Sequence, residues 1–251
     1  MPDSDGELTR RGDSAAERHE TALGSAASLA RHPGPVRVGL FGGTFDPPHV
    51  GHLVTAVNVA HELQLDVVVL MVNNVAWQKE GIREITPAED RYALVAAAVS
   101  TVDRLQPGRH EIELGGNSYT ADTLRVLRDE YPEAEFFTII GDDAAAGLHT
   151  WERYEEVVAQ SRLVVVDRPG EPVELPDDVD WIRVEVPRLE VSSTDLRRRF
   201  TDGRPLDYLV TNPVLRVIAE RGLYGVARGQ DVRDRAGETV GVDVRVGGGS
   251  A

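Results

Sequence analysis

The sequence predicts an α/β fold with a doubly wound, mostly parallel sheet that carries helices on both of its faces. Three continuous apolar runs, at residues 67–72, 136–140 and 163–166, have the pattern of strands that are covered on both sides. Helical patterns alternate with these runs through short turns, which favours parallel pairing of the strands. At 251 residues and 41% apolar content, the chain is long enough to bury a sizeable core.

Local patterns predict the other elements in chain order. Residues 36–41 form a short apolar strand, and residues 53–63 carry apolar side chains at helical spacing. Thr86-Pro87-Ala88-Glu89 has the pattern of a capping box with proline at the first helical position, and its helix should run to about Ser100. Further strands are expected at 109–114, which alternates, and at 181–186; further helices are expected at 119–130, at 151–160, from Ser193 or Thr194, and from Asn212 to Arg221.

We expect one folded domain, at residues 36–225, between two tails. Residues 1–35 are rich in Ser, Ala, Gly, Arg and acidic side chains, a composition that favours disorder. Residues 226–251 are rich in Gly, Arg and Asp. Although residues 239–246 alternate like a strand, they have no obvious partner, and we interpret them as part of a C-terminal tail.

Composition excludes several classes of function. Lys and Arg total 27 against 42 Asp and Glu, and this net charge of -15 argues against a general nucleic-acid binder. The absence of cysteine excludes disulfides, thiolate zinc sites and thiol nucleophiles. The sequence has no run of 18 apolar residues, and its acidic N-terminus lacks the apolar core of a signal peptide. We therefore expect a cytoplasmic protein with no membrane partner.

The stretch Gly42-Gly43-Thr44-Phe45-Asp46-Pro47-Pro48-His49-Val50-Gly51-His52 connects the first strand to the first helix. A strand, a glycine-containing turn and a helix start form the place where α/β sheets bind phosphates. A helical first turn would put His49 and His52 on one face, where imidazoles beside backbone N–H groups suit a polyphosphate whose charge rises during reaction. His-x-x-His alone would also fit a tight turn with two incidental surface histidines, but the surrounding turn favours the phosphate site.

Two later turns carry polar groups at predicted helix starts. The stretch Val191-Ser192-Ser193-Thr194-Asp195-Leu196-Arg197 fits either simple N-caps or a phosphate site made of hydroxyls, free N–H groups and one guanidinium. Gly141-Asp142-Asp143 follows a strand. It fits either acids placed favourably at a helix dipole or a carboxylate that binds ribose hydroxyls.

These stretches resemble known signatures. The first is similar to the first signature of the nucleotidylyltransferase superfamily, whose catalytic (T/H)-x-G-H element is His49-Val50-Gly51-His52 here. Residues 191–197 resemble the second signature, Ile-Ser-Ser-Thr-x-Ile-Arg, with conservative changes at Val191 and Leu196. Together with the motifs described next, residues 37–224 resemble the bacterial nicotinate-nucleotide adenylyltransferases, which implies a Rossmann-like fold.

The resemblance implies which residues act on ATP. His49 and His52 would stabilise the charge of the triphosphate, and Thr44 would hold the attacking or transferred phosphate. The implied ATP-binding residues are Gly42, Gly43, Gly51, Gly141, Asp143, Ser193, Thr194 and Arg197. Asp143 matches the acid of the family's Gly-Ala-Asp, whereas Asp142 replaces the alanine. Mg²⁺ would accompany ATP on the phosphate oxygens, and no protein residue is expected to ligate a metal.

The resemblance also implies a site for the second substrate. Residues 118–124 and His149-Thr150-Trp151 are similar to the family's nicotinate-mononucleotide site, where Thr120 would bind the pyridine carboxylate and Trp151 would stack on the ring. Trp151 as an ordinary core residue is the competing interpretation. Lys79 and Arg168 would bind phosphate. The family's Pro-x-Gly-x-x-Pro becomes Val72-Asn73-Asn74-Val75-Ala76-Trp77 here, which affects the shape of the loop.

The implied reaction is the transfer of AMP from ATP to nicotinate mononucleotide, which gives nicotinate adenine dinucleotide and pyrophosphate. The expected partners are ATP and nicotinate mononucleotide, with no nucleic acid, and the sequence leaves open whether copies of the chain form a homo-oligomer. Three alternatives also stay open: an enzyme for nicotinamide mononucleotide or both mononucleotides, an enzyme for phosphopantetheine, and a non-catalytic nucleotide sensor.

Overall fold

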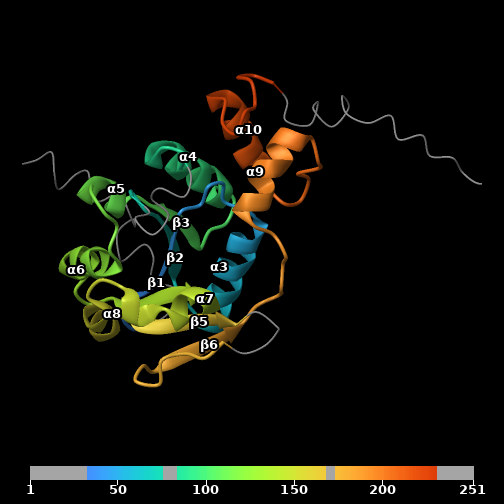
Figure 1. Ribbon diagram of the computed structural model, residues 1–251. Helices are drawn as coiled ribbons and strands as arrows, with labels where there is room; N and C mark the ends of the chain where they lie inside the picture. Colours follow the sequence, from blue (N-terminus) through green and yellow to red (C-terminus); the bar gives the residue numbers. More distant parts are fainter. Residues whose placement is uncertain (1–32, 76–83, 168–172, 231–251) are drawn as a thin grey trace, which may run out of the picture.

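The computed structural model describes residues 33–75, 84–167 and 173–230, and these form a parallel sheet with helices on both faces (Figure 1). Six strands lie in the order β3-β2-β1-β4-β5-β6, and every neighbouring pair is parallel. The strands are β1 (Arg37–Gly43), β2 (Val67–Val72), β3 (Leu105–Gly108), β4 (Glu135–Gly141), β5 (Arg162–Asp167) and β6 (Trp181–Glu185). The predicted fold class is confirmed.

The order of the strands reverses at β1. The chain moves outward from β1 to β2 and β3, and then returns to place β4 on the other side of β1. Gly43 ends β1 and Gly141 ends β4, so both glycines lie at the carboxyl edge of the sheet on either side of the reversal. Open α/β sheets bind ligands at such a switch point.

The helices divide into two layers because a buried strand alternates its side chains between the two faces. Val67, Val69 and Met71 of β2 pack in one core, which contains residues of α6 (Thr120–Glu130) and α8 (Tyr154–Gln160). Val68, Leu70 and Val72 pack in the opposite core, with α3 (Val50–Glu62) and α4 (Ala88–Val99). The remaining helices are α5 (His110–Leu114), α7 (Asp142–Ala146), the 3₁₀ turn η2 (Leu148–Thr150), α9 (Ser193–Asp202) and α10 (Asn212–Arg221).

A third core joins the C-terminal helices to α4. Leu94 of α4, Leu196 and Phe200 of α9, and Ile218 of α10 are buried together in it. Figure 1 shows α4, α9 and α10 grouped on one side of the molecule. This packing brings the start of α9 to the carboxyl edge of the sheet. Within the described part of the chain, no helix combines the length and the apolarity that crossing a bilayer requires.

The expected strand at 109–114 is wrong. Residues 105–108 form β3 and pair with β2, and α5 begins at His110. Proline is disfavoured within a sheet, but β3 lies at the edge of the sheet, where Pro107 is tolerated. The alternation of six residues in 109–114 was too short to separate a strand from a short helix.

Several predicted boundaries also shift. The helix expected from residue 86 begins at Ala88, with Pro87 at the N-cap and no capping side chain, so the capping box does not form. Gly42 and Gly43 end β1, and the turn follows them. The helix expected from Trp151 begins at Tyr154, after η2. The strand-like pattern at 239–246 and most of the predicted N-terminal tail lie outside the described residues.

Candidate active site

The larger of two neighbouring cavities lies at the carboxyl ends of β1 and β4 and has a volume of about 810 Å³. Every residue assigned to catalysis or to ATP by resemblance lines it, which brings together sequence positions from three separate stretches. These residues are Gly42, Gly43, Thr44, His49, Gly51, His52, Gly141, Asp143, Ser193, Thr194 and Arg197. The structure therefore assembles one polar site from the two predicted signatures and the end of β4.

The smaller cavity, of about 380 Å³, lies beside the first and contains Thr120 and Trp151 in its lining. Gly42, Gly43 and Thr44 line both cavities, so the end of β1 and the following residue form a shared wall. Lys79 and Arg168, the other two predicted substrate residues, lie outside the described residues.

The turn after β1 is held in shape by its buried side chains. Phe45 is 2% exposed and adopts a left-handed backbone conformation, with φ 48. Its ring occupies the space beside Gly43, where a Cβ atom would lie 2.8 Å from the Phe45 ring. Glycine is therefore required at residue 43 for the turn to fold back against the strand.

The two histidines of the turn lie against one another. His49 is the N-cap of α3, and its backbone N–H donates to Nδ1 of His52 at 3.1 Å. The two rings are stacked, with centroids 3.7 Å apart. The ring of His52 also meets the ring of Phe45 in an edge-on contact, with centroids 4.9 Å apart. Because Nδ1 of His52 accepts a hydrogen bond, the ring carries its proton on Nε2, where it can donate. Gly51 permits this arrangement, since a Cβ there would lie 3.0 Å from Nδ1 of His49.

The start of α9 is bound directly to this turn. Ser193 Oγ donates to the carbonyl of Pro47 at 2.8 Å, across 146 residues of sequence. Arg197 donates to the carbonyl of Asp46 at 2.7 Å and to Thr194 Oγ1 at 3.1 Å. The two signatures are thus one hydrogen-bonded unit, in which helix N–H groups, hydroxyls and a guanidinium face the same cavity. Such a unit is suited to binding phosphate.

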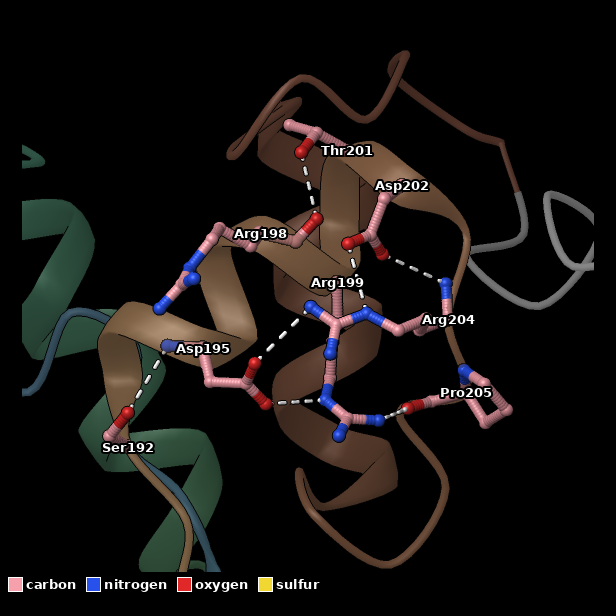
Figure 2. A network of polar contacts seen from close by, with 8 residues as sticks. All are labelled: Ser192, Asp195, Arg198, Arg199, Thr201, Asp202, Arg204 and Pro205. Carbon is pink, nitrogen blue, oxygen red and sulfur yellow. Dashed lines mark hydrogen bonds and ion pairs between the residues drawn. The ribbon is translucent and has the colours of Figure 1, made fainter.

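A network on the outer side of α9 fixes the helix (Figure 2). Ser192 Oγ accepts the backbone N–H of Asp195 at 3.2 Å, as an N-cap does. The Asp195 carboxylate accepts from Arg199 at 2.6 Å and from Arg204 at 3.2 Å, and the bond from Arg199 is the main reason that the pKa of Asp195 is lowered. An acidic group near the phosphate-binding turn is thereby neutralised by two guanidinium groups.

Arg91 and Tyr224 support the turn after β1, and neither was predicted as a site residue. Arg91 is 1% exposed and donates to the carbonyl of Thr44, a residue of the shared wall, at 3.0 Å. The Tyr224 hydroxyl donates to Asp46 Oδ1 at 2.8 Å. Burial, and next the charge of Asp46, raise the pKa of Tyr224, which keeps the hydroxyl protonated as the donor in this bond. Only the tertiary contacts reveal either residue. In a local sequence pattern, an arginine in a helix and a tyrosine near the C-terminus look like surface residues.

An ion pair joins two of the segments that line the smaller cavity. Thr120 begins α6, and Trp151 precedes α8. Arg153 binds Asp122 with two hydrogen bonds, of 3.0 and 2.6 Å, and these bonds are the main reason that the pKa of Asp122 is lowered. Because each partner lies two residues from a cavity-lining residue, this bidentate pair ties the segment that carries Thr120 to the segment that carries Trp151.

A buried carboxylate lines the same cavity. Glu111 is 7% exposed and accepts from the Thr123 hydroxyl at 3.0 Å. Burial raises the pKa of Glu111, and hydrogen bonds from Ser118 and Thr123 oppose this increase. Glu111 was not predicted as a site residue because it was expected within a strand at 109–114. In the larger cavity, Asp142 Oδ1 accepts the backbone N–H of Asp143 at 2.9 Å, which supports the start of α7.

Comparison with known proteins agrees with this geometry. A cytidylyltransferase-like family model matches residues 40–199, which defines the protein as a nucleotidyltransferase. The chain is 42% identical, over 207 residues, to the probable nicotinate-nucleotide adenylyltransferase of Mycolicibacterium vanbaalenii, and the match covers 78% of this chain and 95% of that relative. The chain is also 43% identical, over 194 residues, to the probable nicotinate-nucleotide adenylyltransferase of Corynebacterium kroppenstedtii. That match covers 75% of this chain and 90% of the relative. The chain belongs to the nicotinate-nucleotide adenylyltransferase family, as the resemblance implied.

Solved structures share the fold. The Plasmodium falciparum nicotinic acid mononucleotide adenylyltransferase complexed with NaAD aligns with a TM-score of 0.60 at 14% identity, over 76% of this chain and 98% of that one. A structure from Vibrio parahaemolyticus, described as a putative nicotinate-nucleotide adenylyltransferase, aligns with a TM-score of 0.56 at 20% identity. The alignment covers 78% of this chain and 97% of that one.

Proposed function

We propose that the protein transfers AMP from ATP to nicotinate mononucleotide, giving nicotinate adenine dinucleotide and pyrophosphate. The observation that carries the proposal is the shared wall of Gly42, Gly43 and Thr44 between two cavities. One cavity holds the phosphate-binding unit, and the other holds Thr120 and Trp151. Two nucleotides in these cavities would bring their phosphates together at the shared wall.

In the larger cavity, the phosphate-binding unit would bind the triphosphate. Ser193, Thr194 and Arg197 would hold the β- and γ-phosphates at the start of α9. His49 and His52 would donate to the α-phosphate region and stabilise the charge that develops there. The adenosine would lie across Gly51 and Asp143, with the carboxylate on ribose hydroxyls.

In the smaller cavity, Thr120 would donate to the pyridine carboxylate and Trp151 would stack on the positively charged ring. The Asp122–Arg153 pair supports this arrangement because it ties the segment of Thr120 to the segment of Trp151. Lys79 and Arg168 would bind the phosphate of the mononucleotide. Thr44, in the shared wall, would hold the phosphate that attacks or is transferred.

The reaction needs no protein nucleophile. A phosphate oxygen of the mononucleotide attacks the α-phosphorus of ATP, the new P–O–P bond forms, and the bond to the β-phosphate oxygen breaks to release pyrophosphate. The protein contributes positioning and charge stabilisation, as in phosphoryl transfer generally. Mg²⁺ would be held by phosphate oxygens of ATP and neutralise their charge; among the described residues, no group of three or more His, Asp or Glu side chains could hold a metal ion.

The test is an assay of pyrophosphate release from MgATP with three acceptors: nicotinate mononucleotide, nicotinamide mononucleotide and phosphopantetheine. We expect the highest kcat/KM with nicotinate mononucleotide and a dinucleotide product of the corresponding mass. A higher kcat/KM with either other acceptor would overturn the assignment of the substrate. Binding of ATP without pyrophosphate release from any acceptor would instead identify a nucleotide sensor.

A further inference from the structure

The side-chain amide of Asn73 is held in one orientation at the smaller cavity. Asn73 follows β2, its backbone N–H donates to the Gly43 carbonyl at 3.2 Å, and the residue lines the cavity. Its Oδ1 accepts from Nη1 of Arg91 at 3.0 Å. A guanidinium has donors and no acceptor, so the atom that faces Arg91 must be the amide oxygen.

Arg91 cannot move aside to release this orientation. Its side chain is 1% exposed and also donates to the carbonyls of Thr86 at 2.7 Å, Thr44 at 3.0 Å and Asn74 at 3.0 Å. If the Asn73 amide turned over, its NH₂ group would meet the N–H of Arg91, and two donors would face one another. The amide NH₂ of Asn73 therefore points away from Arg91.

This NH₂ group is available to a ligand. Within residues 33–75, 84–167 and 173–230, Nδ2 of Asn73 has no hydrogen-bond partner, although the residue is in the cavity wall. The neighbouring Asn74 differs, because its Nδ2 donates to the Gly116 carbonyl at 3.0 Å and its side chain is exposed there. Of the two asparagines, only Asn73 both lines the cavity and has an amide donor that is not used within the described residues.

One carboxylate in the wall of the same cavity, that of Glu111, is already used within the protein. Glu111 Oε1 accepts the Thr123 hydroxyl at 3.0 Å, and the Ser118 hydroxyl also bonds to this carboxylate. Ser118 Oγ in turn accepts the backbone N–H of Asn74 at 2.8 Å, which leaves its proton for Glu111. A ligand beside Asn73 would therefore meet a donor in its amide, while the Glu111 carboxylate is engaged within the protein.

We propose that Asn73, oriented by Arg91, is a specificity-determining residue that favours the carboxylate of nicotinate mononucleotide over the carboxamide of nicotinamide mononucleotide. The inference rests on the proposed function. A carboxylate can accept from Asn73 with one oxygen and from Thr120 with the other. A carboxamide has one oxygen, so its NH₂ group would face one of the two donors and leave that donor unpaired.

The test compares Asn73→Asp with Asn74→Asp. Aspartate at residue 73 keeps an oxygen toward Arg91 and replaces the cavity donor by an acceptor. The Asn74→Asp variant introduces the same charge one residue away, on a side chain that does not line the cavity. We expect Asn73→Asp to lower the ratio of kcat/KM for the acid to kcat/KM for the amide by about tenfold or more, the size of one lost buried hydrogen bond. The KM for ATP should stay within about twofold, and Asn74→Asp should leave the ratio unchanged.

Binding provides a second readout. Quenching of tryptophan fluorescence by nicotinate mononucleotide without ATP should need a higher concentration in Asn73→Asp than in wild type or Asn74→Asp, and melting temperatures would confirm that each variant is folded. An unchanged selectivity ratio in Asn73→Asp, or an equal change in both variants, would overturn the inference while wild-type turnover upholds the proposed function. If wild type released pyrophosphate with neither mononucleotide, the proposed function itself would fail.

Discussion

At the scale of single residues, His49 and His52 occupy different positions although both belong to one motif. The backbone of His49 caps α3, whereas the ring of His52 is fixed by the bond from His49 and by the edge of Phe45. The ring of His52 is thereby oriented before ATP binds, and a donor oriented in advance needs no rearrangement when charge develops. This preorganisation makes His52 the clearest test of the catalytic assignment.

Replacing His52 by alanine should lower kcat by about 10² to 10³, the range for loss of one donor to a transition state. Steady-state assays of pyrophosphate release would measure the effect. His61→Ala is the matched control, because His61 lies exposed in the last turn of the same helix. A folded His52→Ala protein with near-normal kcat would exclude this histidine from the mechanism.

The Tyr224 hydroxyl should contribute to stability through its bond to the buried Asp46. Hydrogen bonds to charged groups contribute about 1.5–3 kcal/mol, and Tyr224→Phe removes only the hydroxyl. We therefore expect the free energy of unfolding in urea to fall by an amount of this size. Tyr208→Phe, at a residue that is 92% exposed, should have no measurable effect. Equal stability of the two variants would contradict this role of Tyr224.

Some site residues could be predicted from the sequence and others could not. The phosphate-binding residues lie in stretches whose chemistry is local, since glycine, hydroxyl and imidazole groups gather at a strand end or a helix start. Arg91, Glu111 and Tyr224 are placed by tertiary packing. Each is polar in a pattern that suggests exposure, but distant parts of the chain bury Arg91 and Glu111 and partly bury Tyr224.

At the scale of elements, the start of α9 depends on its N-cap. Ser192 Oγ accepts the N–H of Asp195, and the same turn presents Ser193 and Thr194 to the larger cavity (Figure 2). Ser192→Ala should lower the free energy of unfolding by about 0.5–2 kcal/mol, whereas Ser192→Asp should preserve most of it. Urea denaturation of both variants would show the difference, and equal losses would mean that the cap is not what stabilises this turn.

Element boundaries were the least predictable part of the fold. The long buried strands β2, β4 and β5 were predicted within one residue at each end, because apolar runs between turns have few alternatives. The segment from β3 to α5 was predicted wrongly. Its strand is four residues long and its helix five, so neither has enough sequence to show a period, and the position of each is decided by packing against β2 and α4.

At the scale of the whole molecule, the described cores extend from Val36 to Val226. A chain of residues 33–230 should therefore fold with the melting temperature and kcat of the full chain, as measured by thermal denaturation and pyrophosphate release. A shorter chain, 33–221, loses Tyr224 and Val226 from the third core and should melt at a lower temperature. A large drop in melting temperature for 33–230 would show that residues outside this range contribute to the fold.

The wall shared by the two cavities also has a kinetic consequence. Bond formation needs both nucleotides in place at once, so initial-rate lines for the two substrates should intersect. The dinucleotide product would fill both cavities as one molecule, and it would gain the contacts of both halves while losing the translational freedom of only one. We expect it to compete with each substrate and to leave slowly. The enzyme would therefore be inhibited by its own product. Its net rate would then depend on how fast the next enzyme removes the dinucleotide.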